Sequence, residues 1–572
     1  MKFRSFISAL IAAAAVLFVL GLGGWLVLMA QTPLTFLPGV EATPAATLFV
    51  DKRSPVVVSL MVTPTRLAEL RQVFAAPSRR RQAAQDIERL QADLLAQTHL
   101  DYERDIQPWL GDEITFAVTS ADLDRNAQNG AQPGYLLALA SQDSEQARQF
   151  IQLFWQKRAI AGENLVFEQY AGVKLIYAAD AETAAGNAPL AINNAPLATA
   201  VVGDRFVLLA NSPLVLRQAI NAAQASDLNL QQAPAYRQAL RQLPSRRLGL
   251  IYCDFHQLSG WLVGLPDQPV VDRSQQVIEN LLVNLQLTSQ GLLADTLLTA
   301  AAGEAFEPSQ PKLSKPSEAL AYMPANAPFV AAGSHLSTLV KQMNSGFSGY
   351  PVVQQLVGPL LSQLQTQWNI DLPTVLANFG EGNYGLAWLP HDEPATADWL
   401  FAIENDETTR NYLAALDEQA RQQGLSVGTL EVDEQPVTAW ARLSADAQET
   451  SADALALRAD VVGLKANVGD QVILATAAEG LQQSLAANHR SILQSTDFHQ
   501  AIAALDTRND GYLYFDWPQV GERMRQQSPQ LRWLSTSFQP FLKYLKSVTI
   551  SSYGSDASFQ RGGIFIRLME SR

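Results

Sequence analysis

The sequence has almost no cysteine: Cys253 is the single one among 572 residues. One cysteine excludes an intramolecular disulfide and any metal site built from several cysteines. A nearly cysteine-free chain also avoids wrong pairings in an oxidising compartment. We expect Cys253 to be a buried core thiol.

Positive charge is also scarce, since 41 Lys and Arg residues stand against 55 Asp and Glu, for a net charge of −14. Such a surface repels phosphate, so nucleic acid is not an expected partner. Hydrophobic residues make up 48% of the chain, which is enough to bury large cores. A chain of this length is expected to form more than one domain.

One long run without charge lies near the N-terminus, at residues 7–29 (ISALIAAAAVLFVLGLGGWLVLM). As a helix it would be about 35 Å long, enough to cross a bilayer. Lys2 and Arg4 precede the run, and the next charged residue is Glu41. We therefore predict a single-pass anchor in the plasma or thylakoid membrane, with residues 1–6 cytoplasmic and the rest in the periplasm or lumen. A cleaved signal peptide is the alternative, although its apolar region is normally shorter.

The sequence pattern predicts that the chain contains the same design twice. VVGDRFVLLANSP at 201–213 is echoed by ANVGDQVILATAA at 466–478, and each is a strand, a Gly-Asp turn and a second strand that leads into a helical pattern. We expect hairpin turns at Gly203-Asp204 and Gly469-Asp470, with a positive φ at the glycine. Flanking segments recur in the same order, which predicts a tether at 30–47, repeats at 48–300 and 321–572, and a linker at 301–320.

Apolar residues alternate with period two in short runs joined by Gly-containing turns, which is typical of antiparallel hairpins. Amphipathic helices that would cover a single sheet face are predicted at 79–98, 143–158, 213–223, 351–369, 407–423 and 529–545. Long flexible hairpin excursions are expected at 178–198 and 444–460. Since strands and helices do not alternate regularly, the predicted fold class is α+β: two tandem homologous repeats, each a mostly antiparallel sheet packed against helices, after one transmembrane helix.

This arrangement resembles the cyanobacterial branch of the DUF3352 family. The resemblance rests on the anchor followed by PGVEATPAATLFVD (38–51), on the two Gly-Asp hairpins, and on the L-x-Y-x-D-type strand ends at 250–254 and 512–516. The family is named for its unknown function, so the resemblance implies no catalytic residues.

Two segments match the sequence motifs of nucleotide-binding proteins and hydrolases. GEGNYG (380–385) fits a dinucleotide fingerprint and GLSVG (424–428) fits a nucleophile elbow around Ser426. Both chemistries need a strand before the motif and a helix after it, whereas here a helical pattern comes first and a strand follows. We interpret both as helix-to-strand turns.

The segment DLDRNAQNGAQP (122–133) begins like a calcium loop but has Ala127 and Pro133 where that loop needs Gly and Glu. The six histidines lack metal-ligand spacing. No metal, cofactor or catalytic residue is therefore predicted.

Asp254 and Asp516 each close a strand just before a helical pattern, where a carboxylate can cap the helix. A paired catalytic role for the two carboxylates is the sharper alternative. The hypothesis we favour is a non-catalytic accessory or scaffolding protein that contacts other proteins of the membrane. A carrier of an apolar, lipid-like ligand is the alternative, and an atypical hydrolase the third.

Overall fold

The computed structural model describes most of the chain outside the N-terminal region. It covers residues 40–41, 43–63, 101–126, 128, 130–179, 197–258, 277–288, 290–334, 336, 379, 382–390, 397–446, 456–487, 490–521 and 545–568. The predicted helices 79–98 and 351–369, and all but the last residue of 529–545, lie outside these ranges. So does the predicted anchor at 7–29, and no helix among the described residues is both long and apolar enough to cross a membrane.

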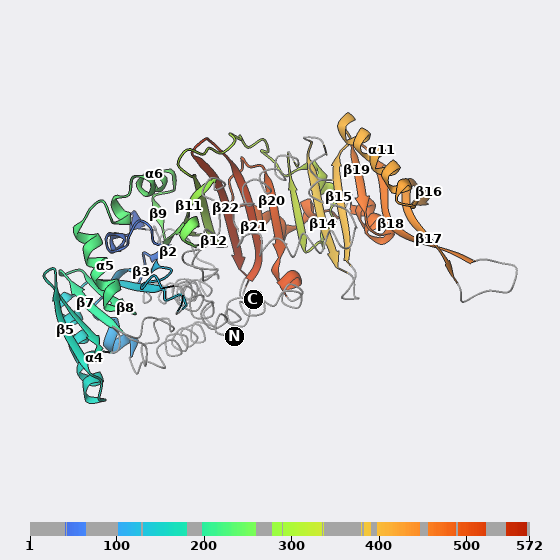
Figure 1. The fold of residues 1–572 in the computed structure, drawn as a ribbon. Helices are drawn as coiled ribbons and strands as arrows, with labels where there is room; N and C mark the ends of the chain where they lie inside the picture. The colour runs from blue at the N-terminus through green and yellow to red at the C-terminus, as the bar shows by residue number, and fades with distance from the viewer. Residues whose placement is uncertain are drawn as a thin grey trace, which may run out of the picture.

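A curved antiparallel sheet of twenty strands runs the length of the molecule (Figure 1). Its first ten strands are β2 (Val56–Leu60), β3 (Leu110–Ser120), β4 (Gly134–Ser141), β5 (Leu165–Tyr170), β6 (Val173–Ala178), β7 (Ala198–Val202), β8 (Phe206–Ala210), β10 (Gly249–Asp254), β11 (Ile278–Leu287) and β12 (Gly291–Ala300). The other ten are β13 (Phe329–Gly333), β14 (Tyr384–Pro390), β15 (Ala397–Glu404), β16 (Ser426–Val432), β17 (Gln435–Asp446), β18 (Ala456–Val468), β19 (Gln471–Ala475), β20 (Gly511–Asp516), β21 (Leu545–Ser555) and β22 (Phe559–Leu568). The predicted antiparallel α+β fold is therefore confirmed at this level.

The pairing order of the first ten strands is β5-β6-β7-β8-β4-β3-β2-β10-β11-β12. From there β12 pairs with β22, and the order continues β22-β21-β20-β13-β14-β15-β19-β18-β17-β16. Within the described residues, β5 and β16 therefore form the two edges of the sheet. A separate short pair joins β1 (Val40–Glu41) to β9 (Arg246–Arg247).

Four of the described α-helices begin where a short polar side chain accepts the first free backbone N–H groups, whereas α6 and α12 begin without such a cap. Asp143 caps α4 (Ser144–Ile160), Ser212 caps α5 (Pro213–Gln224), Asp406 caps α11 (Glu407–Gln422) and Ser495 caps α13 (Thr496–Ile502). The remaining helices are α6 (Pro234–Gln242), α12 (Ala478–Ala486) and the shorter η2 (Ala45–Phe49), η3 (Tyr102–Ile106), η5 (Leu230–Gln232), η7 (Glu318–Tyr322) and η9 (Ile492–Gln494).

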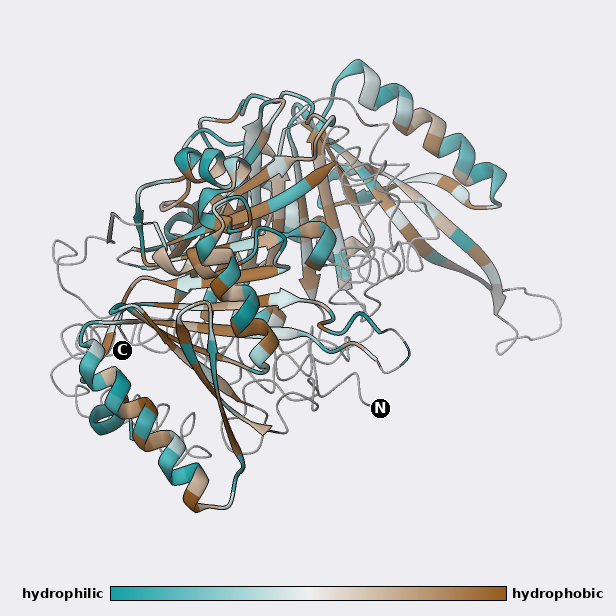
Figure 2. Ribbon diagram, turned by 60° about the vertical axis from the view of Figure 1, so that its left-hand side comes forward, coloured by the Kyte–Doolittle hydropathy of each residue, from teal (hydrophilic) through white to brown (hydrophobic). Residues whose placement is uncertain are grey.

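Helices cover both faces of the sheet, and the prediction of a single covered face was wrong. Neighbouring residues of β3 show this, because Ala117 packs with α5 whereas Phe116 packs with Trp155 of α4. We call these two sides the α5 face and the α4 face. In the second half α12 and α13 pack on the α5 face and α11 on the α4 face. Strands covered on both sides are apolar at successive positions, and brown residues are frequent along the strands in Figure 2.

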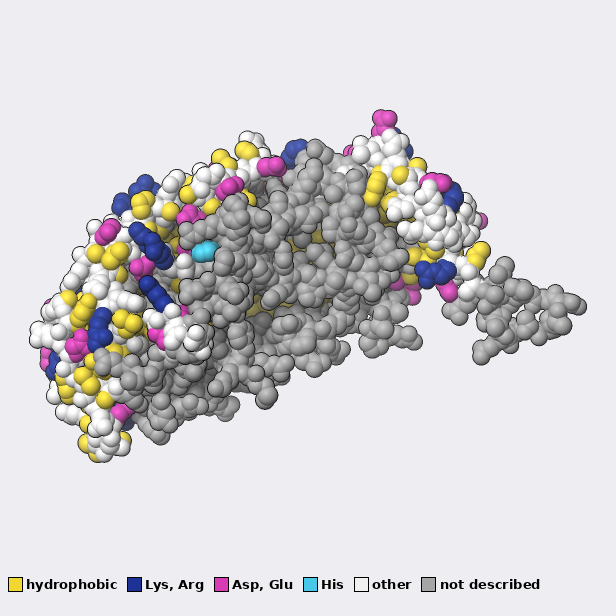
Figure 3. Space-filling view, viewed as in Figure 1, with side chains coloured by type: hydrophobic (Ala, Val, Ile, Leu, Met, Phe, Trp, Pro, Cys, Tyr) yellow, Lys and Arg dark blue, Asp and Glu magenta, His cyan; other side chains and the backbone are white. Residues whose placement is uncertain are grey.

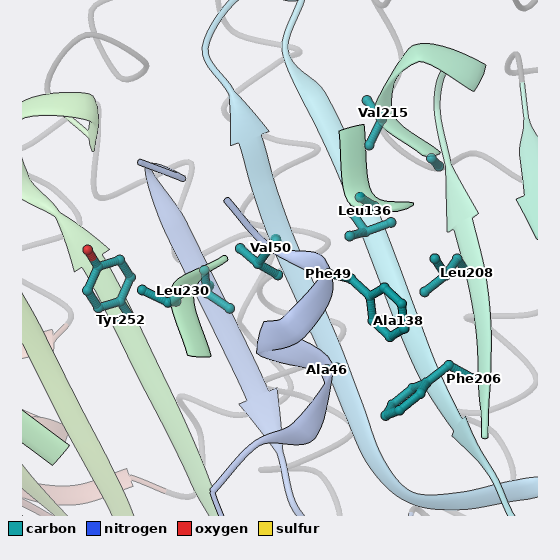
Figure 4. Packing of buried hydrophobic residues seen from close by; sticks show 14 of the residues in the cluster. Ala46, Phe49, Val50, Leu136, Ala138, Phe206, Leu208, Val215, Leu230 and Tyr252 are labelled. Atoms are coloured by element: carbon teal, nitrogen blue, oxygen red, sulfur yellow. The ribbon is translucent and has the colours of Figure 1, made fainter. Parts of the chain in front are cut away.

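The first core begins earlier than the boundary at residue 48 predicted from the sequence. Ala46, Thr47 and Phe49 of η2 are buried among strand residues on the α5 face (Figure 4). The carboxylate of Glu113, itself buried, accepts the backbone N–H groups of Ala45 and Ala46, both at 2.8 Å. A buried carboxylate therefore fixes the start of η2 to β3.

Two segments expected to be loose are held by backbone hydrogen bonds. In the predicted linker, Ser309 exchanges two such bonds with Ser555, at 3.0 and 2.9 Å. In the predicted excursion at 444–460, β17 and β18 stay paired as far as Asp446 opposite Ala456. The first contact is an isolated antiparallel bridge, whereas the second extends the β17–β18 ladder.

The seam between the two halves is the ladder between β12 and β22. It runs unbroken from Gly291 opposite Arg567 to Thr299 opposite Phe559. Each strand also contributes to the opposite core, since Phe559 is buried in the first core and Leu293 packs against the second. The halves are thus joined by backbone hydrogen bonds and by shared packing.

Candidate functional site

A row of three polar side chains crosses adjacent strands near one end of the second half. Asp516 closes β20 and lies opposite Ser547 of β21, which in turn lies opposite Arg567 of β22. Residues that face each other across antiparallel strands point to the same side of the sheet. We call these three residues the polar row, and α13 packs over it on the α5 face.

Arg567 is buried, and side chains around α13 neutralise it. Its guanidinium donates to Asp497 Oδ1 at 2.8 Å and to the side-chain oxygen of Gln500. Lys546 contacts the other oxygen of Asp497 at 2.9 Å. Burial would raise the pKa of Asp497, but the hydrogen bonds from Arg567 and Lys546 outweigh it and lower the pKa. The ionised carboxylate of Asp497 therefore forms ion pairs with both Arg567 and Lys546.

The rest of the row is incompletely hydrogen-bonded. Ser547 and Thr549 are fully buried, and neither hydroxyl has a hydrogen-bond partner among the described residues. Oδ1 of Asp516 is likewise buried without one, and burial raises the pKa of this carboxyl. An unsatisfied buried polar group costs about 1–3 kcal/mol. The row therefore keeps buried polar atoms whose hydrogen-bonding capacity is not used within the described residues.

The row lacks the features of an activated nucleophile. A catalytic serine needs a base within hydrogen-bond reach, whereas the Ser547 hydroxyl makes no such bond within the described residues. Nor do those residues bring together three His, Cys, Asp or Glu side chains that could hold a metal ion.

In the corresponding row of the first half, the polar side chains have hydrogen-bond partners within the protein. Asp254 lies opposite Asn280, and Asn280 lies opposite Thr299. Asn280 accepts a hydrogen bond from Tyr252 at 2.8 Å and donates to Thr299 Oγ1 at 3.2 Å. Oδ1 of Asp254 accepts from the backbone N–H of Gln257 at 2.9 Å, which is the geometry of a helix cap. The first row is thus a closed structural network.

Asp254 and Asp516 do not form one site. Five strand-to-strand steps separate β10 from β20. At about 4.8 Å a step, the two strands are about 24 Å apart. The alternative of a paired catalytic role was therefore wrong, because carboxylates must lie within a few ångströms to share a reaction.

The four Gly-Asp residues lie in turns on the two sides of the molecule. Gly203 and Gly469 both have a φ of +57°, in the turns between β7 and β8 and between β18 and β19. Asp204 is exposed and pairs with Arg148 of α4 at 2.6 Å. The backbone oxygen of Asp470 accepts from Asn405 at 2.7 Å. These residues shape and fasten hairpins, and they are far from the polar row along the sheet.

The structure places the other candidate residues from the sequence at the start of a strand, in a loop and in the core. Ser426 is exposed at the start of β16, directly after α11, so the order is helix then strand. Asp122 accepts the backbone N–H of Gln132 and so closes the loop between β3 and β4. Cys253 is buried as predicted, and burial raises the pKa of its thiol to about 12.

The sequence did signal Asp516, but not its neighbours. Ser547 and Thr549 alternate with apolar residues in the pattern of a strand with a solvated face. The structure buries that face under α13, which the alternation alone does not reveal. Arg567 stands between Ile566 and Leu568, and a charge inside an apolar strand was the signal that could have found it.

Comparison with known proteins places the chain in a family. The model of DUF3352, described as a protein of unknown function, matches residues 10–568. The chain belongs to the DUF3352 family. No curated protein matched this DUF3352 chain. Crystal forms III and I of TP0453 are similar to it with a TM-score of 0.23 each, at 8% and 9% identity, and cover 46% and 47% of this chain and 82% and 83% of TP0453. At that TM-score the similarity supports no inference about fold or function.

Proposed function

We propose that this DUF3352 protein is a non-catalytic scaffold that is anchored in a plasma or thylakoid membrane by residues 7–29. Residues 1–6 would be cytoplasmic, and the body would lie in the periplasm or lumen and contact other proteins of the membrane. The uncharged run with Lys2 and Arg4 before it supports the anchor and its orientation.

The scaffold is built from two tandem homologous repeats, at 48–300 and 321–572. Support comes from the pairing order, because the ten strands of each half occur in the same order when read from the sheet edge to the seam. Gly203 and Gly469 also share the same φ at corresponding turns. Asp295 lies opposite Gly563 in the middle of the seam. Two copies joined through equivalent strands would be related by a two-fold axis near this pair.

The seam is the observation that carries the scaffold proposal. Proteins that close around a ligand usually move two bodies about a few hinge residues. Here a complete β-ladder joins the halves, and the side chain of Gln242 also accepts from Arg561 across it at 3.0 Å. Bending at the seam would break several backbone hydrogen bonds at once. The geometry therefore favours a long rigid body with fixed separation between its two ends.

A carrier for an apolar ligand is the second candidate, and one observation favours it. On the α4 face of the central strands, several aliphatic side chains are only partly buried, among them Ile251, Val283, Val548, Ile564 and Ile566. Within the described residues, the long helices of this face pack elsewhere, α4 against β7 and α11 against β16. A groove over these strands would suit a lipid-like ligand.

The two functions are separated by purification of the full chain from detergent-solubilised membranes, with mass spectrometry of both proteins and co-extracted lipids. The scaffold predicts a reproducible protein partner, and the carrier predicts a lipid without one. Recovery of neither would contradict both. A Leu20→Arg variant places a charge in the middle of the anchor and should be lost from carbonate-washed membranes, whereas Leu20→Ile should remain.

A further inference from the structure

The first half carries exposed apolar side chains on α4 and β5 at its outer end. Leu153 and Ile160 of α4 are 57% and 87% exposed, and Phe167 of β5 is 61% exposed. We call these three residues the apolar tip. Hydrophobic side chains are visible at the end of the molecule where Figure 1 places α4 and β5 (Figure 3). Large apolar side chains clustered at one end of a protein mark an interaction surface.

The fold itself does not require exposure at these three positions, because the corresponding unit of the second half does not repeat it there, although that unit exposes Leu443 of β17 and Val461 of β18. Counted from the capping residues Asp143 and Asp406, the positions of Leu153 and Ile160 correspond to Leu416 and Gln423. Leu416 is partly buried and Gln423 is polar. Counted from the β5–β6 and β16–β17 turns, Phe167 corresponds to Thr429. The second unit thus folds in the same way without exposed apolar side chains at these positions.

Positive charge accompanies the tip. Lys174 lies with its Nζ 5.3 Å from the centre of the Phe167 ring, and Lys157 lies in the last turn of α4. Arg158 is paired with Glu163. Asp105, which Lys157 also approaches, is paired with Arg104. Because Asp101 and Glu103 lie beside Asp105, the positive charge of Lys157 is offset. Lys174 is therefore the cation that contacts the tip directly.

We propose that the apolar tip inserts into the headgroup layer of the bilayer in which the chain is anchored, and that it favours anionic lipid. Exposed Phe, Leu and Ile flanked by lysine are the chemistry that an anionic membrane surface recognises. This inference rests on the proposed membrane anchor, since tethering raises the local concentration of lipid and lets a small patch bind. Docking at the tip would fix the orientation of the long sheet relative to the membrane.

The test uses the full chain with Ile160→Cys, labelled with an environment-sensitive fluorophore and reconstituted in vesicles. Cys253 is buried and burial raises the pKa of its thiol to about 12, so it should stay unlabelled in the folded protein. In vesicles of phosphatidylcholine with phosphatidylglycerol, we expect a blue-shifted emission and a several-fold loss of quenching by aqueous iodide. Gln423→Cys, the matched position of the second half, should remain fully quenched.

The outcomes separate the tip from the anchor. If the chain does not float with the vesicles, the proposed anchor fails. If it floats but the label at position 160 behaves as in water, the tip proposal is overturned while the anchor stands. Protection in native membranes but not in lipid vesicles would assign the tip to a protein partner and also overturn it. Ile160→Gln with Phe167→Thr, which installs the residues of the second half, should remove the protection of a label at Leu153→Cys.

Discussion

At the scale of single residues, the two halves use the same strand position differently. Asp254 and Asp516 each accept the backbone N–H of the residue three positions later, Gln257 and Gln519. Asp516 differs in lying beside two buried hydroxyls that have no partner in the described part of the chain. Burial raises the pKa of Asp516, and Lys546 opposes this shift only in part. Ionisation of Asp516 is therefore less favourable in the folded protein than in the unfolded chain.

Substitution Asp516→Asn should change how stability depends on pH. The folded-state pKa of Asp516 is raised above its ordinary value of 3.8, so its contribution to stability is present at low pH and is lost as pH rises through the raised pKa. Asparagine still caps a helix but cannot ionise. We expect urea unfolding at a series of pH values to show this difference. As pH rises from about 3.8 through the raised pKa of Asp516, the free energy of unfolding of the variant should increase relative to that of the wild type.

Asp204→Asn serves as the control, because this carboxylate is exposed and pairs with Arg148 at the surface. It should change the free energy of unfolding by no more than about 1 kcal/mol. If the free energies of unfolding of Asp516→Asn and the wild type differed by the same amount at every pH, the raised pKa of Asp516 would be contradicted.

At the scale of elements, hairpins and helix starts were the most predictable features. The helices predicted at 143–158, 213–223 and 407–423 are α4, α5 and α11, because each begins at a capping side chain next to an amphipathic pattern. The faces they cover were not predictable in this way. β3 is apolar at successive positions, so its sequence shows that both sides are covered but not by which helix.

Attachment of η2 gives a prediction at this scale. Glu113→Ala would leave the buried backbone N–H groups of Ala45 and Ala46 without an acceptor. Loss of buried hydrogen bonds to a charged group should lower the free energy of unfolding by about 2–4 kcal/mol. Asp143→Ala removes the exposed cap of α4 and should lower the free energy of unfolding by less than Glu113→Ala does. Equal costs in chemical denaturation would show that η2 is not held by Glu113.

At the scale of the whole molecule, the seam was beyond sequence reasoning. The residues that meet there, such as Asp295 and Gly563, lie far apart in the chain. The alternation of apolar residues in β12 and β22 predicts two strands but does not indicate which strand each of them pairs with. Register between distant strands is decided by the packing of both halves together. The two Gly-Asp hairpins could be inferred from the sequence, but not the way the two halves join into one sheet.

Gly291→Val tests whether the seam makes the two halves one rigid body. A Cβ at this position would collide with the backbone oxygen of Ile566 and the ring of Phe565, so β12 and β22 must move apart. Overpacking of this kind should lower the free energy of unfolding by about 1–3 kcal/mol. Spin labels placed by Arg237→Cys and Gln482→Cys, on α6 and α12 of the two halves, should give a narrow distance distribution that the variant broadens.

Gly428→Val is the matched control, since a Cβ at this position of β16 meets nothing within 4 Å. It should keep both the stability and the narrow distribution, because it leaves the seam intact. If Gly291→Val also kept the narrow distribution, the ladder would not be what fixes the separation of the two ends. The rigid scaffold would then lose its main support, and a body that bends at its centre to enclose a ligand would become the better account of the same sheet.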